Sequence, residues 1–273
     1  MKRILLLSDL HVGSAYGMWP AGMVEEDDQT GELKPILQNP VNLAIEEHWN
    51  IMLSVIRRAP PEIVVWNGDQ IEGPQDSEKG RGLMTLSVDL MVDAAEKIIQ
   101  TVRDAAPDAV FYFTAGTKYH QKSDGSGADK DLAKRFKSEF GNELIIEECG
   151  IRMFCRHMIS STLSTWQYMA TAPGRDHMLL YLNRSPEKYG PVDIAVFSHR
   201  HQFVEVHFSS GMAIVTPCWQ SKTPYASKKG IVGVPEIGWV MLHVYGPKKI
   251  LVDTTGIKTV VRPCKIVGRD GRK

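Results

Sequence analysis

Five short apolar segments, each followed closely by an acidic or imidazole side chain, most constrain what this chain can fold into. Each segment is rich in residues that favour β-strands, and the polar residues come at or just after its end. The side chains that follow these segments are Asp9 and His11, Asp69, His120, His157, and His199 and His201. Open α/β sheets bind their ligands outside the carboxyl ends of the strands. The sequence therefore predicts that these side chains gather at one edge of a sheet.

The residue types favour a site for two metal ions. A carboxylate that bridges two cations about 3.5 to 4 Å apart is the centre of a two-metal hydrolytic site, and Asp69 is the candidate bridge. Side chains two residues apart share one face of a strand, and at a strand end the turning chain can let them straddle two ions. Carboxylate and imidazole ligands suit Mn²⁺, Fe or Zn²⁺ better than Ca²⁺. We expect two divalent ions, with Mn²⁺ first and Fe or Zn²⁺ as alternatives.

Each of these residues has a simpler explanation when it is taken singly. An isolated Asp-x-His is usually a turn, and a lone histidine in an apolar run, such as His157, is more often a hydrogen-bonded core residue. The ordered series at strand ends favours the metal site instead. Four histidines lie outside the series, and we assign them structural roles: His48, His177, His207 and His243.

The order of the motifs resembles that of the calcineurin-like metallophosphoesterases, across residues 4–201. The family pattern is D-x-H, then G-D-x-x-D/E, then G-N-H, a lone His, and G-H-x-H. The chain carries Asp9-Leu10-His11, Gly68-Asp69 with Glu72, and His199-Arg200-His201. Residues 216–225 also resemble a segment of phage and prophage members. The resemblance implies an α/β fold, a metallophosphoesterase-like sandwich of two mixed β-sheets flanked by helices.

The resemblance also implies a role for each site residue. Asp9, His11 and His201 would hold the first metal, His157 and His199 the second, and Asp69 would bridge the two. The third motif departs from the family, because Thr117 stands where the family has a metal-binding Asn and His120 comes two residues late. We expect Thr117 to be a weaker ligand of the second metal. His120 is either the general acid, if its loop folds back, or an ordinary loop histidine.

The predicted function is metal-dependent hydrolysis of phosphate esters. Phosphodiesters are favoured over phosphomonoesters, with nucleic acid as one candidate substrate, because eleven basic residues stand against three acidic ones from Gln220 onward. That basic excess has a second explanation, a solvated surface and a frayed end. The alternative function is a catalytically degenerate scaffold or binding protein of the same fold. Thr117 and Ser198, which replaces the usual Gly, are the residues that favour the alternative.

The chain is predicted to form a single domain over residues 1–265, followed by a basic tail at 266–273. Apolar periodicity predicts amphipathic helices at 42–58 and 83–106. After residue 194 the chain is rich in strands, which predicts a second, mainly antiparallel sheet from residues 202–208, 212–216, 238–245, 249–253 and 259–261.

Two segments fit no regular element and are expected to rim the site. Residues 14–39 directly follow the first motif and carry Gly, Pro and the acidic run Glu25-Glu26-Asp27-Asp28. We expect this insertion to be a lid rather than part of the core, since long loops in compact domains are usually functional. Residues 118–130 form the second such segment.

Cysteine usage and hydropathy predict a cytoplasmic protein. The four cysteines show no C-x-x-C pair, which favours free thiols in a reducing compartment. The apolar start ends at Ser8 and Asp9, before a signal peptide of the required length exists. Apolar runs stay well short of the roughly 20 residues of a membrane span, so we expect no membrane partner. The oligomeric state is left open.

Overall fold

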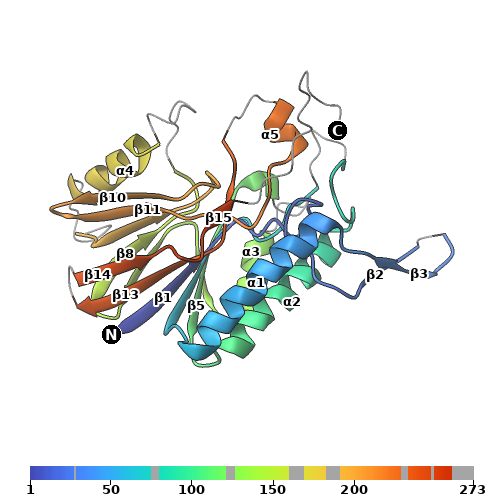
Figure 1. Cartoon of the computed structure of the whole chain (residues 1–273), viewed down its shortest axis with the longest axis horizontal. Coiled ribbons are helices and arrows are strands. Elements are labelled where there is room, and N and C mark those ends of the chain that lie inside the picture. The colour runs from blue at the N-terminus through green and yellow to red at the C-terminus, as the bar shows by residue number, and fades with distance from the viewer. Residues whose placement is uncertain are drawn as a thin grey trace, which may run out of the picture.

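The computed structural model describes residues 1–27, 29–74, 80–120, 127–159, 169–182, 191–228, 233–246 and 249–259. Two mixed β-sheets face each other, and helices cover their outer faces (Figure 1). This is the two-sheet α/β sandwich that the family resemblance implied. Among the helices of the described residues, none combines the length and the apolar character that crossing a membrane requires.

The first sheet is six-stranded. In sheet order its strands are β14 (Lys249–Asp253), β13 (Val240–Gly246), β1 (Lys2–Leu7), β4 (Ile63–Asn67), β5 (Val110–Thr114) and β6 (Glu139–Gly141). The last four run parallel, and β13 lies antiparallel to both β1 and β14. A parallel strand that is covered on both faces has a continuous apolar sequence. This explains why Ile4–Leu7 and Ile63–Trp66 are apolar throughout.

The second sheet is five-stranded and closes the other side of the sandwich. In order its strands are β10 (Val204–Phe208), β11 (Gly211–Val215), β9 (Ile194–Phe197), β8 (Ile151–Cys155) and β7 (Leu144–Glu148). Alternate side chains of β1 divide the core: Ile4 and Leu6 face the second sheet, whereas Leu5 and Leu7 face the helices. Side chains of a strand alternate between its two faces, so one short strand serves both layers.

Helices α1 (Pro40–Arg58), α2 (Val88–Ala105) and α3 (Ala128–Arg135) lie over the first sheet, and α4 (Thr171–Leu182) lies over the second (Figure 1). The helix predicted at 42–58 is confirmed, with Asn39 as its capping residue and the predicted apolar stripe buried. The second helix begins later than predicted, at Val88. Ser87 caps its first turn, and Leu86, which lies inside the predicted range, precedes the helix and is exposed.

Two sequence predictions need correction. The strands after residue 194 do not form one mainly antiparallel sheet. β10 and β11 belong to the second sheet, which is mixed, whereas β13 and β14 complete the first sheet because β13 pairs with β1. Strand periodicity reports which residues face the core, and it carries no information on which strand is the neighbour.

Residues 14–39 also contain more structure than a loop. They form a hairpin of β2 (Met23–Glu26) and β3 (Leu33–Ile36) that projects from the body beside α1 and α2 (Figure 1). At its base, Met18 and Trp19 are buried in the helix-covered core. This part of the segment therefore belongs to the core, contrary to the lid prediction. Asp28 of the acidic run and the basic tail at 266–273 lie outside the described residues.

The remaining elements are short. They are the 3-10 helix η2 (Lys118–His120), β6 noted above, α5 (Pro224–Lys228) and a two-stranded pair of β12 (Glu236–Ile237) with β15 (Lys258–Thr259). The loops that carry the candidate ligands follow the carboxyl ends of β1, β4, β5, β8 and β9, as the sequence predicted.

Candidate metal centre

Five of the candidate ligands share an unusual backbone conformation. The φ angles are 51° at Asp9, 47° at His11, 54° at Asp69, 72° at His199 and 55° at His201. This left-handed region is uncommon for residues other than glycine. Residues with a strained backbone of this kind are found mainly at functional sites. Each residue lies just past a strand, so the reversed backbone turns its side chain out of the strand direction and toward the shared edge.

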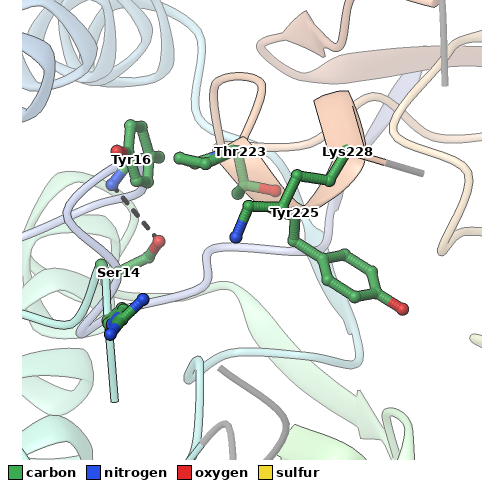
Figure 2. A pocket seen from close by; sticks show the side chains of 8 residues that line it. Ser14, Tyr16, Thr223, Tyr225 and Lys228 are labelled. Atoms are coloured by element: carbon green, nitrogen blue, oxygen red, sulfur yellow. Dashed lines mark hydrogen bonds between the residues drawn. The ribbon is translucent and has the colours of Figure 1, made fainter. Parts of the chain in front are cut away.

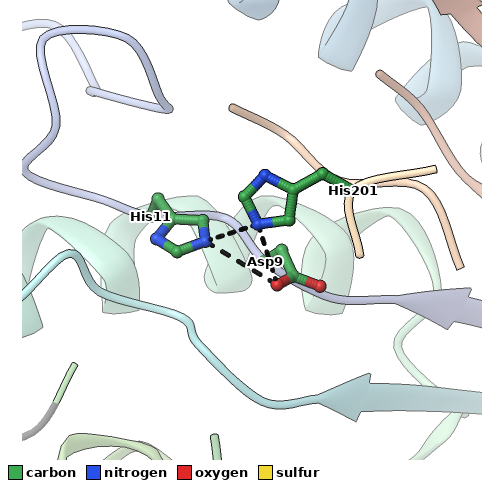
Figure 3. A group of neighbouring side chains, drawn as sticks. All are labelled: Asp9, His11 and His201. Carbon is green, nitrogen blue, oxygen red and sulfur yellow. Dashed lines mark hydrogen bonds and ion pairs between the residues drawn. The ribbon is translucent and has the colours of Figure 1, made fainter. Parts of the chain in front are cut away.

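The first group of facing side chains consists of Asp9, His11 and His201 (Figure 3). The Nε2 atom of His201 lies 3.2 Å from Oδ1 of Asp9 and 3.1 Å from Nε2 of His11. His11 Nε2 lies 3.7 Å from the same Oδ1 atom. One carboxylate oxygen and two imidazole nitrogens therefore converge on a single point.

The second group consists of Asp69, His157 and His199. Oδ2 of Asp69 lies 2.8 Å from Nε2 of His157 and 4.0 Å from Nδ1 of His199. His199 and His201, two residues apart in the chain, thus enter different groups, which is the straddling arrangement expected at a strand end. The two groups adjoin, because His157 Nε2 lies 3.9 Å from Oδ1 of Asp9.

A third group joins the first two through His11, Asp69 and His120. The 3-10 helix η2 folds His120 back, so its Nε2 lies 3.9 Å from Oδ2 of Asp69 and its ring meets the His11 ring edge-on at 4.6 Å between centroids. The late position of His120 in the motif therefore does not keep it from the site.

Oxygen atoms hold the opposite ring nitrogen of three histidines. Nδ1 of His157 donates to the carbonyl of Asn67 at 2.7 Å, and Nδ1 of His120 donates to the carbonyl of Glu72. Nδ1 of His11 lies 2.7 Å from the Glu72 carboxylate, as an ion-pair contact rather than a hydrogen bond. Partners of this kind fix the tautomer and orient imidazoles that bind metals, leaving Nε2 free to face the ion.

Glu72 and Gln220 are site residues to which the sequence analysis gave no role. The Gln220 amide donates to Oε2 of Glu72 at 2.7 Å, so it supports the carboxylate that holds His11. Glu72 could have been found from its place in the G-D-x-x-E motif. Gln220 carries no such signal, because it lies 148 residues away from its partner.

The loop after β5 packs directly against Asp69. A Cβ atom at Gly116 would lie 2.1 Å from Oδ1 of Asp69, so only glycine fits there. Thr117 donates to the Asp69 carboxylate from its backbone at 2.6 Å and from its hydroxyl at 3.2 and 3.3 Å. Buried Asp129 accepts from the backbone of Gly116 and Gln70 and ties this loop to the one after β4. Thr117 thus positions Asp69 here, and its role as a metal ligand stays a prediction.

Ser198, the departure in the last motif, belongs to a buried polar chain behind the site. Its hydroxyl lies 2.6 Å from the Thr216 hydroxyl and accepts from the Asn67 amide at 2.6 Å. The Thr216 hydroxyl lies 2.7 Å from that of Ser8. The carbonyl of Asn67 holds His157, so Ser198 stabilises a ligand loop rather than facing the centre.

The carboxylates and the imidazoles of the site stabilise each other's charged forms. Burial would raise the pKa of the Asp9 and Asp69 carboxyls, but the facing imidazoles, His157 first, hold both well below their usual value. Burial would likewise lower the histidine values. The Glu72 carboxylate nevertheless raises the pKa of His11 to about 10, and Asp69 with Asp9 raises that of His157 to about 9. Without metal, protons on the imidazoles balance the buried carboxylates.

The donor set fits divalent cations. Among the residues that the structure describes, Oδ1 of Asp9 and Nε2 of His157 are buried polar atoms with no hydrogen-bond partner. Nε2 of His157 lies 2.8 Å from Oδ2 of Asp69 without forming a hydrogen bond to it. Buried polar atoms are normally paired, and a cation would satisfy these.

The other histidines have structural partners, in line with their assignment. His48 bonds the carbonyl of Gly256, His177 stacks on Phe208, His207 pairs with Glu205, and His243 faces Asp253. Cys149, Cys155 and Cys218 are free thiols, and Cys264 lies outside the described residues.

No protein-family model and no curated protein matches the chain. Solved structures match it at low identity. Zinc-bound Vps29 of Entamoeba histolytica is 10% identical, with a TM-score of 0.45 over 94% of this chain and 96% of that one. Vacuolar protein sorting 29 of Cryptosporidium parvum is 9% identical, with a TM-score of 0.46 over 96% and 98%. An archaeal phosphodiesterase is 10% identical, with a TM-score of 0.44 over 92% and 98%. At these values the likenesses give no information on activity, which we infer from the site itself.

Proposed function

We propose that this chain is a metal-dependent phosphoesterase that acts on phosphodiesters in preference to phosphomonoesters. The observation that carries the proposal is the pair of adjoining groups, each with one carboxylate and two imidazoles, joined across 3.9 Å between Asp9 and His157. Two divalent ions held there would activate a water molecule and neutralise charge on the phosphoryl group. Mn²⁺ is the first candidate, with Fe and Zn²⁺ as alternatives.

The chain's own residues would set the geometry. Asp9, His11 and His201 would hold one ion, and Asp69, His157 and His199 the other. Asp69 is the candidate bridge, because it belongs both to the second group and to the group that contains His11. The left-handed backbone holds these side chains in place before substrate arrives, so little reorganisation remains for the reaction.

His120 is the candidate general acid. Its Nδ1 is occupied by the Glu72 carbonyl, its Nε2 faces the centre, and its side chain stays 19% exposed. A protonated Nε2 can give its proton to the departing oxygen as the bond from that oxygen to phosphorus breaks. The neutral imidazole would then recover a proton from water.

The test begins with protein stripped of metal by EDTA and reconstituted with Mn²⁺, Fe²⁺ or Zn²⁺. Bis-p-nitrophenyl phosphate should be hydrolysed faster than p-nitrophenyl phosphate, and only with metal present. Asp69→Asn should reduce turnover to background because it weakens both groups at once. The matched control is Asp108→Asn, an exposed carboxylate in the turn before β5. An Asp69→Asn variant with full activity would exclude the two-metal site. Metal binding by the wild type without turnover of either ester would indicate the scaffold function instead.

A further inference from the structure

A pocket of about 210 Å³ has Ser14, three residues after His11, in its wall (Figure 2). Its walls come from three segments: Ser14 and Tyr16 after β1, Arg81 after β4, and Thr223, Tyr225 and Lys228 after β11. Backbone hydrogen bonds tie these segments together, from Ala15 to the Gly82 carbonyl at 2.7 Å and from Ser221 to the Tyr16 carbonyl at 2.7 Å. The pocket is therefore already formed in the free protein.

A short chain of hydrogen bonds and ion pairs connects the pocket to the metal centre. The Gln220 amide donates both to the Ser14 hydroxyl, at 3.1 Å, and to the Glu72 carboxylate, at 2.7 Å. That carboxylate holds His11. The backbone of Ser14 also donates to the carbonyl of His11 at 3.0 Å. The buried side chains of Ser14, Gln220 and Glu72 thus join the wall of the pocket to the support of His11.

The residues around the pocket suit a nucleotide. Arg81 and Lys228 are cationic, and none of the described residues that line the pocket is acidic. Lys228 extends into the space between Ser14 and Thr223 in Figure 2. The Tyr225 side chain is 44% exposed and so presents ring surface to solvent. Cations that contact phosphate, together with an aromatic face for an unstacked base, are the means by which proteins bind single-stranded nucleic acid.

The size of the pocket limits the ligand to a fragment. Sites for whole drug-sized ligands measure about 300 to 1,000 Å³, so this pocket holds one part of a larger molecule. We propose that it binds the nucleotide next to the scissile diester, with a phosphate at Lys228 and Arg81 and a base on Tyr225. The inference rests on the proposed phosphodiesterase function and names its substrate class, a single-stranded oligonucleotide.

Binding tests the proposal without any need for turnover. In an Asp69→Asn background, the Kd of dye-labelled tetrathymidylate is measured by fluorescence anisotropy at several salt concentrations. Lys228→Gln should weaken binding on the order of tenfold, because it removes a charged contact. It should also lower the slope of log K against log salt by about 0.7, the value for one phosphate contact on a single strand. The matched control is Lys97→Gln, an exposed lysine on α2. Equal effects of the two substitutions would overturn the proposal.

The aromatic contact has its own test. Tyr225→Leu should weaken tetrathymidylate binding at least about fivefold, whereas Tyr225→Phe, which keeps the ring face, should bind like the parent. Equal binding by the Leu and Phe variants would show that no base stacks on Tyr225 and would overturn that part of the proposal.

Kinetics separate this proposal from the proposed function. In the active protein, Lys228→Gln should raise KM for a dithymidine diester that carries a terminal phosphate, and should leave KM for bis-p-nitrophenyl phosphate unchanged. An equal change for both substrates, or no change for either, would overturn the subsite. If the wild type hydrolyses neither diester, the proposed function fails, and the binding experiment still decides whether the pocket holds a strand.

Discussion

Raising the pH should destabilise the metal-free protein, because buried imidazolium groups support its carboxylates. His11, His157 and His201 all have a pKa raised above the ordinary imidazole value by facing acidic or thiol groups, against the opposing effect of burial. A group of this kind stabilises the folded state fully below its unfolded pKa. The stabilisation disappears as the pH rises through the folded pKa.

The magnitude can be worked from His157. Its pKa rises from 6.5 in the unfolded chain to about 9 in the fold. Each tenfold gain in proton affinity corresponds to about 1.4 kcal/mol. Between about pH 6 and pH 10 the free energy of unfolding should therefore fall by about 3 kcal/mol through this residue. His11, with a folded pKa of about 10, changes stability in the same direction.

The assay is urea unfolding in EDTA at both pH values, for the wild type and for His157→Gln. The variant lacks the titrating group. The difference in free energy of unfolding between the wild type and the variant should therefore be smaller by about 3 kcal/mol at the higher pH. Leu33→Ala, at an exposed position on β3 that carries no titrating group, is the control and should keep the wild-type pH dependence.

Bound metal should reverse this pH dependence of stability. Imidazoles bind cations only when they are deprotonated, so the stabilisation gained from Mn²⁺ should increase with pH. A metal-free protein whose unfolding free energy is flat or rising up to about pH 10 would refute the ion-pair account of the site. So would a constant gap between the wild type and His157→Gln.

Three further predictions follow from named contacts. Glu72→Gln should weaken metal binding about 10- to 100-fold by releasing His11, measured by competition with a fluorescent chelator; unchanged affinity would exclude this supporting role. His120→Ala should reduce kcat more for an alkyl leaving group than for nitrophenolate, and equal losses would remove His120 as the acid. Trp19→Ala should destabilise the fold by about 3 to 5 kcal/mol in urea unfolding, whereas Leu33→Ala on the exposed hairpin should change stability little; the reverse order would contradict the buried base of this segment.

The sequence by itself determined the strand ends and the residue types placed there. An apolar β-forming run followed by Asp or His is a local pattern, and the parallel arrangement brings such ends to one edge. Asp9, Asp69, His157, His199 and His201 were all predicted in this way, and the structure brings them together. The helix at 42–58 was predictable for the same reason, since its apolar spacing and its cap lie within one stretch of chain.

Only the tertiary structure decided which of those side chains form each metal group and which other residues hold them in place. Packing between distant segments sets three features of the site. These are the left-handed backbone at five ligands, the position of His120 at the end of η2, and the contacts of Glu72 and Gln220 that support His11. One of the two neighbours of β1 is β13, more than two hundred residues away, and strand periodicity is equally compatible with other neighbours. Trp19 is buried because the helix-covered core receives it, although the composition around it indicates a loop. Local patterns record which face of an element is buried, whereas long-range contacts choose the partner that buries it.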